Sequence, residues 1–234
     1  MGGFMNRGFT LVELLIALAV SGIIMTGVYS AFKTQQDSYL AQEQVAEMQQ
    51  NLRASLYVMT REIRMAGYDG GNDTSHASCS LYTPGTPGTF GSSVAPGILA
   101  VTADQLDFSM DLNGDGDCAD TGENLSYYIY TASDGIDKLG RRDNHFLPVQ
   151  AVAESFEELE FIYLDSSPAA TTSLNDIRSV QVSILAAARH PDRKYTNNQT
   201  YTSASGVDWT PTPDHLRRRF QTMTVKCRNI GLKL

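Results

Sequence analysis

The sequence predicts an α+β protein in which a long N-terminal α-helix packs on an antiparallel β-sheet head. The first observation is an apolar run of about twenty residues near the N-terminus, enough to span a hydrocarbon core. A helical pattern without proline then continues to about residue 66. The second observation is a C-terminal region of short alternating apolar runs with no long helical pattern between them. Strands without intervening helices favour antiparallel pairing over a βαβ arrangement.

The N-terminus divides into a leader and an apolar segment. Residues 1–8 are glycine-rich, and residues 9–28 contain one charge, Glu13. A charge at the centre of a membrane costs at least ~2.5 kcal/mol, so an unpaired Glu13 is a poor feature of a plain anchor. Cleavage between Gly8 and Phe9 would create an amino group four positions from this carboxylate. The two groups would then pair within one helix or between two subunits.

The helix is expected to continue over residues 29–66 as an amphipathic segment. Gly67 is a suitable C-terminal glycine for it. Apolar residues recur three or four positions apart, which predicts one stripe for a sheet to cover. The members of this stripe are Val45, Met48, Leu52, Leu56, Met59 and Ile63.

Residues 67–234 are expected to form the head. Two segments rich in turn-forming residues, 71–97 and 190–212, are expected to be long irregular loops. Alternating apolar residues predict strands between and after these loops. The predicted strands cover residues 106–110, 125–130, 159–163, 180–184 and 223–227.

Charge and cysteine content limit the compartment and the partners. The net charge is −8, which argues against a nucleic-acid partner, because nucleic-acid binders usually carry a basic footprint. All three cysteines follow the apolar segment, so they are expected on the oxidising side of the membrane. Cys227 lies in an apolar strand and is expected to be a buried thiol. Cys79 and Cys118 lie in loops and are the expected disulfide pair.

The segment Asp-Leu-Asn-Gly-Asp-Gly-Asp at residues 111–117 resembles the first half of an EF-hand calcium loop. Oxygen side chains alternate, and a glycine at the sixth position permits the sharp turn. The twelfth position is Gly122 rather than glutamate, so the alternatives are a weak calcium loop between strands and a charged Asx turn. Repulsion between crowded carboxylates favours calcium. The expected ligands are Asp111, Asn113, Asp115, Asp117, Asp120 and Glu123.

The motifs expected of enzymes are missing from the sequence, so no catalytic residue is assigned and the protein is not expected to be an enzyme. There is no Gly-x-Ser-x-Gly, His-Glu-x-x-His or glycine-rich phosphate loop. Glu158 and Glu160 imitate a glycosidase pair, but both are expected to face water. The run of three arginines at 217–219 is expected to pair with acids of the head or of a neighbour.

Several stretches carry a resemblance to a known family. Residues 7–13, Arg-Gly-Phe-Thr-Leu-Val-Glu, together with the apolar helix after them, resemble the N-terminus of type IV pilins. Residues 61–68, 139–141 and 217–229 resemble the corresponding stretches of PilW-like minor pilins. The resemblance implies cleavage by a prepilin peptidase after Gly8, N-methylation of Phe9, and a role of Glu13 in assembly.

The same resemblance implies a place and a function. A minor pilin is held in the inner membrane with a periplasmic head, and joins the pilus at the cell surface. It primes or joins pilus assembly with other minor pilins and the major pilin. One alternative is a J-like minor pseudopilin of a type II secretion system.

Two further alternatives remain open. A secretory signal peptide would be cut after its apolar region, which leaves Glu13 unexplained. A calcium-dependent pilus-tip adhesin or DNA-uptake subunit would bind its ligand through the two long loops. The aromatic residues available there are Tyr82, Phe90, Tyr195, Tyr201 and Trp209.

Overall fold

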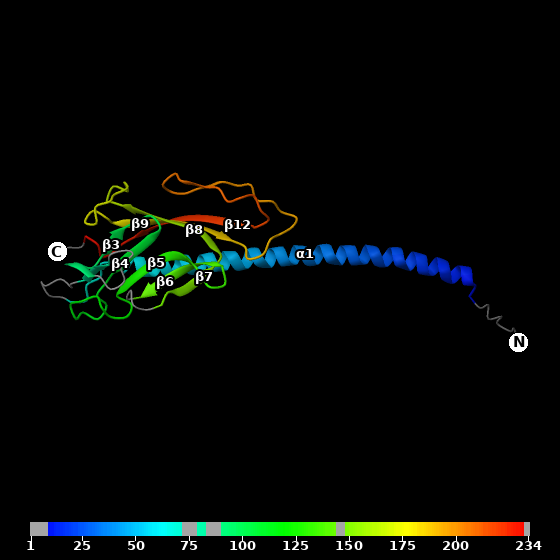
Figure 1. Cartoon of the computed structure of the whole chain (residues 1–234), viewed down its shortest axis with the longest axis horizontal. Coiled ribbons are helices and arrows are strands. Elements are labelled where there is room, and N and C mark those ends of the chain that lie inside the picture. Colours follow the sequence, from blue (N-terminus) through cyan, green and yellow to red (C-terminus); the bar gives the residue numbers. More distant parts are fainter. Residues whose placement is uncertain (1–8, 72–78, 83–89, 144–147, 232–234) are drawn as a thin grey trace. The chain divides into compact units, whose positions relative to one another are not determined.

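The structure is a computed structural model that describes residues 9–71, 79–82, 90–143 and 148–231, with the side chains of residues 79–94 outside the description. The chain divides into two compact units, Met1–Gln44 and Val45–Leu234. Figure 1 shows the whole chain coloured along the sequence. The second unit is the head expected from the sequence, with the last part of the long helix added to it.

The predicted long helix is confirmed, as α1 (Leu11–Ile63), and no proline interrupts it. In the first unit its large apolar side chains are exposed, for example Leu11 at 76% and Ile23 at 75%. Within the described residues, α1 is the helix whose length and composition suit a membrane crossing.

In the second unit α1 buries the predicted stripe. Met48, Leu52, Leu56, Met59 and Ile63 are each at most 6% exposed. Turns at residues 64–67 follow the helix.

Gly67 ends these turns with a φ of +79°, and its amide donates to the carbonyl of Ser109 at 2.9 Å. A Cβ at this position would lie 2.8 Å from Cγ1 of Ile230. Both the left-handed backbone and the close approach therefore require glycine, as the sequence indicates.

The strands form antiparallel pairs, as predicted, but they divide into separate sheets. The largest is a five-stranded sheet in which each strand pairs with the next one along the chain. Its strands are β3 (Ile98–Val101), β4 (Gln105–Ser109), β5 (Asn124–Thr131), β6 (Asp137–Asp143) and β7 (Gln150–Glu154). A three-stranded sheet has the order β12-β9-β8, with β8 (Phe156–Leu164), β9 (Ser179–Ala187) and β12 (Arg218–Lys226).

Both segments predicted as irregular loops contain paired strands. β1 (Cys79–Tyr82) pairs with β2 (Phe90–Val94), and β10 (Tyr201–Thr202) pairs with β11 (Asp208–Trp209). The prediction of wholly irregular loops is therefore wrong. Short strands rich in Ser and Thr lack the apolar alternation by which the longer strands were recognised.

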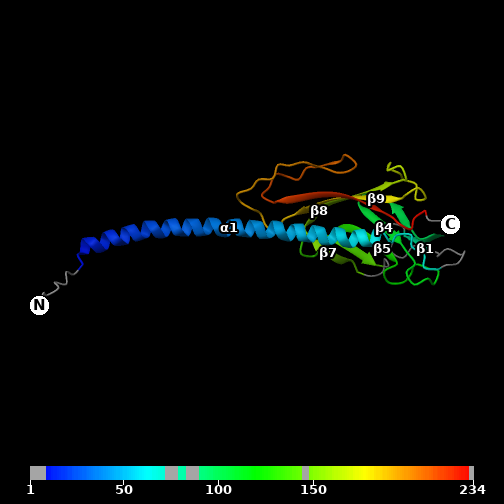
Figure 2. The ribbon, with the colours of Figure 1, turned by 180° about the vertical axis from the view of Figure 1, so that it is seen from behind.

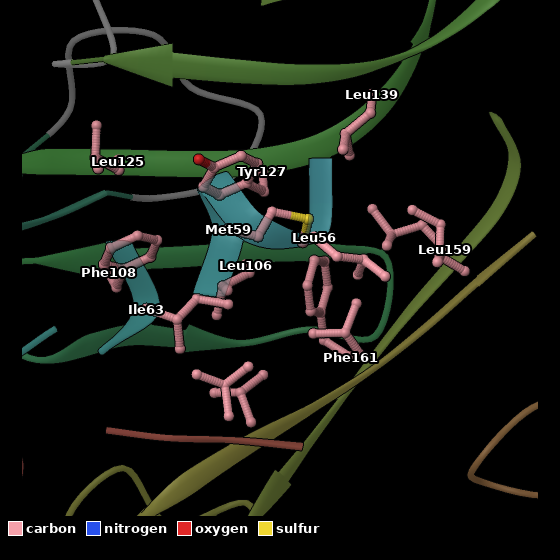
Figure 3. Packing of buried hydrophobic residues seen from close by; sticks show 14 of the residues in the cluster. Leu56, Met59, Ile63, Leu106, Phe108, Leu125, Tyr127, Leu139, Leu159 and Phe161 are labelled. Carbon is pink, nitrogen blue, oxygen red and sulfur yellow. The ribbon is translucent and has the colours of Figure 1, made fainter. Parts of the chain in front are cut away.

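The core of the head joins α1 to both larger sheets. In Figures 1 and 2 the part of α1 in the head runs between β9 and β12 on one side and β5 and β7 on the other. Figure 3 shows the buried side chains where they meet, among them Met59, Leu106 and Phe161. The rings of Phe108 and Tyr127 stack with centroids 6.3 Å apart. The amide of Phe161 donates to Ala103 at 2.7 Å, which ties β8 to the β3–β4 turn.

A second, smaller core lies under the β10–β11 hairpin. Tyr201 and Trp209 are 9% and 8% exposed and pack with Leu185 and Phe220. The expectation of free aromatic side chains in this loop is therefore wrong for these two residues. Tyr195 also has a partner, because the guanidinium of Arg217 lies 4.5 Å from its ring centroid.

The hairpin also covers a carboxylate that was expected to face water. Glu160 on β8 is 8% exposed, and it accepts hydrogen bonds from the amide and hydroxyl of Ser205. The long segment after β9 folds back over β8, which the sequence pattern of the strand does not reveal. Glu158 remains partly exposed. Its pKa is raised, first by partial burial and then by the negative charge of the nearby Glu157.

Candidate functional site

Thr10 and Glu13 cap the N-terminus of α1. The amide of Thr10 donates to Oε2 of Glu13 at 3.4 Å, and the amide of Glu13 donates to Oγ1 of Thr10 at 3.3 Å. This reciprocal pair is a capping box, which uses the spacing Ser/Thr-x-x-Glu. The carboxylate also lies at the positive end of the helix dipole. The capping box was not predicted from the sequence, although the spacing of Thr10 and Glu13 alone indicates it.

The groups expected in processing lie just before this cap. Gly8 lies outside the described residues, and Phe9 is 87% exposed. In the uncut chain the nitrogen of Phe9 belongs to the peptide bond with Gly8, so it carries no amino group for Glu13. The pairing of Glu13 with the Phe9 amine therefore stays a prediction for the processed protein.

The acidic loop after β4 is organised by two buried carboxylates. Asp111 accepts the amides of Gly114 at 2.6 Å and Gly116 at 3.1 Å. Glu123 accepts the amides of Leu112 at 2.8 Å and Asp120 at 3.1 Å. These four hydrogen bonds to two buried carboxylates hold the loop closed.

The remaining expected calcium ligands are exposed and bonded within the loop. The amide group of Asn113 donates to Asp115 at 3.0 Å and to Asp120 at 2.7 Å, and Asp115 accepts the amide of Asp117 at 3.1 Å. Among the described residues, no group of three or more His, Cys, Asp or Glu is placed to hold a metal ion. The calcium site stays a prediction that requires these oxygens to leave their present partners.

The acidic loop is fixed to the segment that follows α1. The amide of Asp111 donates to Tyr68 at 2.8 Å, and the amide of Gly70 donates back to Asp111 at 3.0 Å. Gly70 and Gly114 approach so closely that a Cβ on Gly114 would lie 3.0 Å from the Gly70 backbone. The acidic loop therefore lies beside the end of the helix, which the sequence does not indicate.

The cysteines behave differently from one another. Cys118 is disulfide-bonded, whereas Cys227 is a buried free thiol whose pKa burial raises to about 12. The buried thiol was expected for Cys227. The side chain of Cys79 lies outside the described side chains, so its pairing with Cys118 stays a prediction.

A polar cluster links the last turn of α1 to β5 and β6. Nε of Arg141 donates to both oxygens of Glu62 at 3.1 Å, and the hydroxyl of Tyr127 donates to the same carboxylate. Burial, and then the charge of Glu62, raises the pKa of Tyr127, so its hydroxyl stays a donor. Arg141 also contacts Asp143 at 3.4 Å. This cluster ties the helix end to β5 and β6.

Two family models match the chain. The prokaryotic N-terminal methylation motif matches residues 4–29, and the type IV pilus-assembly protein W model matches residues 144–229. The chain is therefore type IV pilin-like at its N-terminus and PilW-like over residues 144–229.

No curated protein sequence matches the chain. Among solved structures, a type IV-like pilin from Thermus thermophilus aligns with a TM-score of 0.42 and 14% sequence identity. The alignment covers 78% of this chain and 97% of that chain.

The second matched region contains the three arginines expected to pair with acids, and ion pairs are seen for Arg217 and Arg218. Nη2 of Arg217 lies 2.8 Å from Asp192 and holds the pKa of that carboxyl below its usual value. Arg218 contacts Glu157 at 2.6 Å and Asp214 at 2.7 Å. The expectation is confirmed for both, and these pairs tie the end of the 190–217 segment to β8 and β12.

Proposed function

We propose that this protein is a minor pilin that primes or joins the assembly of a type IV pilus. The observation that carries the proposal is the methylation motif at the start of an exposed apolar helix, with Glu13 at the third helical position. A helix with this much uncovered apolar surface needs lipid or other helices around it. The membrane stores the subunit, and the filament core receives it.

Processing precedes assembly in this proposal. A prepilin peptidase cuts after Gly8, and methylation follows on Phe9. The new amine then replaces the backbone amide of Thr10 as a partner of Glu13, either in the same chain or in the next subunit. Pairing neutralises the carboxylate, which lowers the cost of moving this end of the helix into an apolar filament core.

The head is the part that selects neighbours. It lies on the periplasmic side of the inner membrane, and it contacts other minor pilins and the major pilin. Calcium binding to the acidic loop is a further part of the proposal, supported by the alternating oxygens at Asp111, Asn113 and Asp115. Few free aromatic side chains are left for an adhesin, since Tyr201 and Trp209 are buried.

Deletion of the gene and complementation test this function. The deletion strain is expected to lose surface pili and twitching motility, and the wild-type gene is expected to restore both. Secretion of enzymes through a type II system should be unchanged. A strain with normal pili and failed secretion would instead assign the protein to a secretion pseudopilus.

A further inference from the structure

An open groove of about 1070 Å³ follows α1 along the head. The helix and the residue after it contribute Arg53, Tyr57, Arg61 and Arg64 to it, and Tyr57 is 71% exposed. These positions are three or four residues apart, so they lie on one side of the helix. Met223 of β12 lies at the junction of strand and helix, with its sulfur 3.6 Å from the hydroxyl of Thr60.

The charge of this groove is opposite to that of the whole chain. Five arginines and one acid line it, in a protein with a net charge of −8. The acid, Glu62, already binds Arg141. In the described part of the chain, no carboxylate forms an ion pair with the other four arginines. These four are Arg53, Arg61, Arg64 and Arg228, and all are exposed.

The helix dipole explains only part of this cluster. Arg61 and Arg64 lie at the C-terminus of α1, where positive charge is favourable. Arg53 lies about two turns before Arg61, and its Nε donates to the carbonyl of Gln49. Arg228 follows β12 and is not on the helix at all. The dipole therefore does not account for Arg53 and Arg228, and the like charges that the groove brings together from two elements would be neutralised by a bound anion.

The groove also has the residue composition and the exposed strand edge that suit binding of an extended peptide. Arginine and tyrosine are enriched in protein interfaces, in contrast to lysine and acidic residues. Leu56, Met65 and Met223 provide an apolar floor below the charged rim. Among the described strands, β12 is the end strand of its sheet and pairs with β9 alone. A free strand edge beside apolar pockets is the arrangement to which an added strand binds.

We propose that this groove, lined by Arg53, Tyr57, Arg61, Arg64 and Arg228, docks an extended acidic segment of a different pilus subunit. Its carboxylates pair with the arginines, and its alternate apolar side chains contact the floor. The inference rests on the proposed function, because it takes the occupant from the same filament.

A binding assay with the full-length processed protein in neutral detergent tests the proposal. The probe is a fluorescent twelve-residue peptide that alternates Glu with Val, and a Lys-Val peptide of equal length is the comparison. Anisotropy should show binding of the Glu peptide, weakening as salt rises. The Arg53→Gln, Arg61→Gln double variant should weaken binding at least tenfold, and Arg53→Lys, Arg61→Lys should retain most of it.

The control variant changes charge equally outside the groove. Arg189→Gln with Arg193→Gln removes two exposed arginines that do not line it. This control should bind the Glu peptide like the wild type. Circular dichroism of each variant establishes that α1 and the sheets are intact, so a loss of binding is not a loss of folding.

Several results would overturn the inference. Equal binding of the two peptides, or an equal loss in the control variant, would remove the groove as the site. Displacement of the peptide by phosphatidylglycerol vesicles would assign the arginines to lipid headgroups. Self-association of the wild type in sedimentation, absent from the double variant, would assign the groove to a second copy. None of these outcomes changes the deletion phenotype, so the proposed function is judged separately.

Discussion

Arg141 donates its Nε to both carboxylate oxygens of Glu62, at 3.1 Å each, and so joins β6 to the last turn of α1. The two residues are far apart in the sequence, and each belongs to a stretch that resembles PilW-like pilins. The side chains are 18% and 20% exposed, so water screens the pair only in part. The pair sets the position of the helix end, from which both the acidic loop and the arginine groove extend.

Replacing Arg141 with methionine is expected to destabilise the head by about 2 kcal/mol. The change leaves Glu62 partly buried with only the Tyr127 hydroxyl as a partner, and an uncompensated buried charge is costly. Urea denaturation of the full-length protein in detergent measures the loss. Arg189→Met is the control, because Arg189 contacts Glu154 at 3.5 Å on an exposed surface and should cost less than about 0.5 kcal/mol. Equal losses would contradict a structural role for the Glu62–Arg141 pair.

Processing is expected between Gly8 and Phe9. Intact-mass measurement of the membrane-extracted protein should show the loss of residues 1–8 and the gain of one methyl group. Gly8→Arg should leave the leader attached, since a long side chain then occupies the cleavage position. A mature N-terminus after Ala17 would instead indicate a secretory signal peptide.

Two variants at the helix cap distinguish the role of Glu13 in capping the helix from the role of its negative charge. Glu13→Gln keeps an acceptor for the Thr10 amide, because glutamine also completes a capping box, but it removes the charge. Thr10→Ala removes a cap partner and keeps the charge. Membrane insertion should be unharmed in both variants, as judged by carbonate extraction.

Incorporation into sheared pili should fall strongly in Glu13→Gln and little in Thr10→Ala. The physical reason is that only the carboxylate can neutralise the Phe9 amine. The opposite order would show that Glu13 acts as a helix cap alone. Immunoblots of the pilus fraction measure incorporation, and immunoblots of the membrane fraction measure insertion.

A disulfide between Cys79 and Cys118 is expected to stabilise the head by about 4 kcal/mol in the chain-entropy model, since it closes a long loop. Peptide mapping without reduction should recover these two cysteines linked. Cys227 should react with an alkylating agent only after unfolding, because it is 1% exposed and its pKa is raised to about 12. A peptide that contains Cys227 in a disulfide would refute the pairing.

Calcium is expected to raise the melting temperature of the full-length protein in detergent relative to a chelator. The misfit at Gly122 and Glu123 predicts a weak site, with a Kd of ~10⁻⁴–10⁻³ M. At a hundredfold excess over Kd, linkage adds ~2.7 kcal/mol. Asp115→Asn with Asp120→Asn keeps hydrogen-bond acceptors but removes two charges, and should abolish the difference.

Asp111 is less suited to this test. Its carboxylate holds the amides of Gly114 and Gly116 in the absence of metal, so Asp111→Ala should lower the melting temperature with or without calcium. No response of the wild type at several millimolar calcium would show that the loop is a charged turn only.

The sequence alone determined the features that depend on local pattern. Apolar spacing predicted a continuous helix over residues 9–66, and α1 covers Leu11–Ile63, because a stripe at helical spacing lets one face bury Leu52, Met59 and Ile63. Gly67 was recognised for the same reason, since its left-handed backbone is a local property. Alternation predicted β4, β5, β8, β9 and β12.

Only the tertiary structure decided which distant groups meet. Burial of Glu160 and Trp209 depends on a hairpin that folds back over β8 and β9, and the Glu62–Arg141 pair depends on how α1 lies between two sheets. The arginine groove arises in the same way, from residues of α1 and from Arg228 beyond β12. Such contacts are set by the packing of whole elements, and spacing within one element carries no information about them.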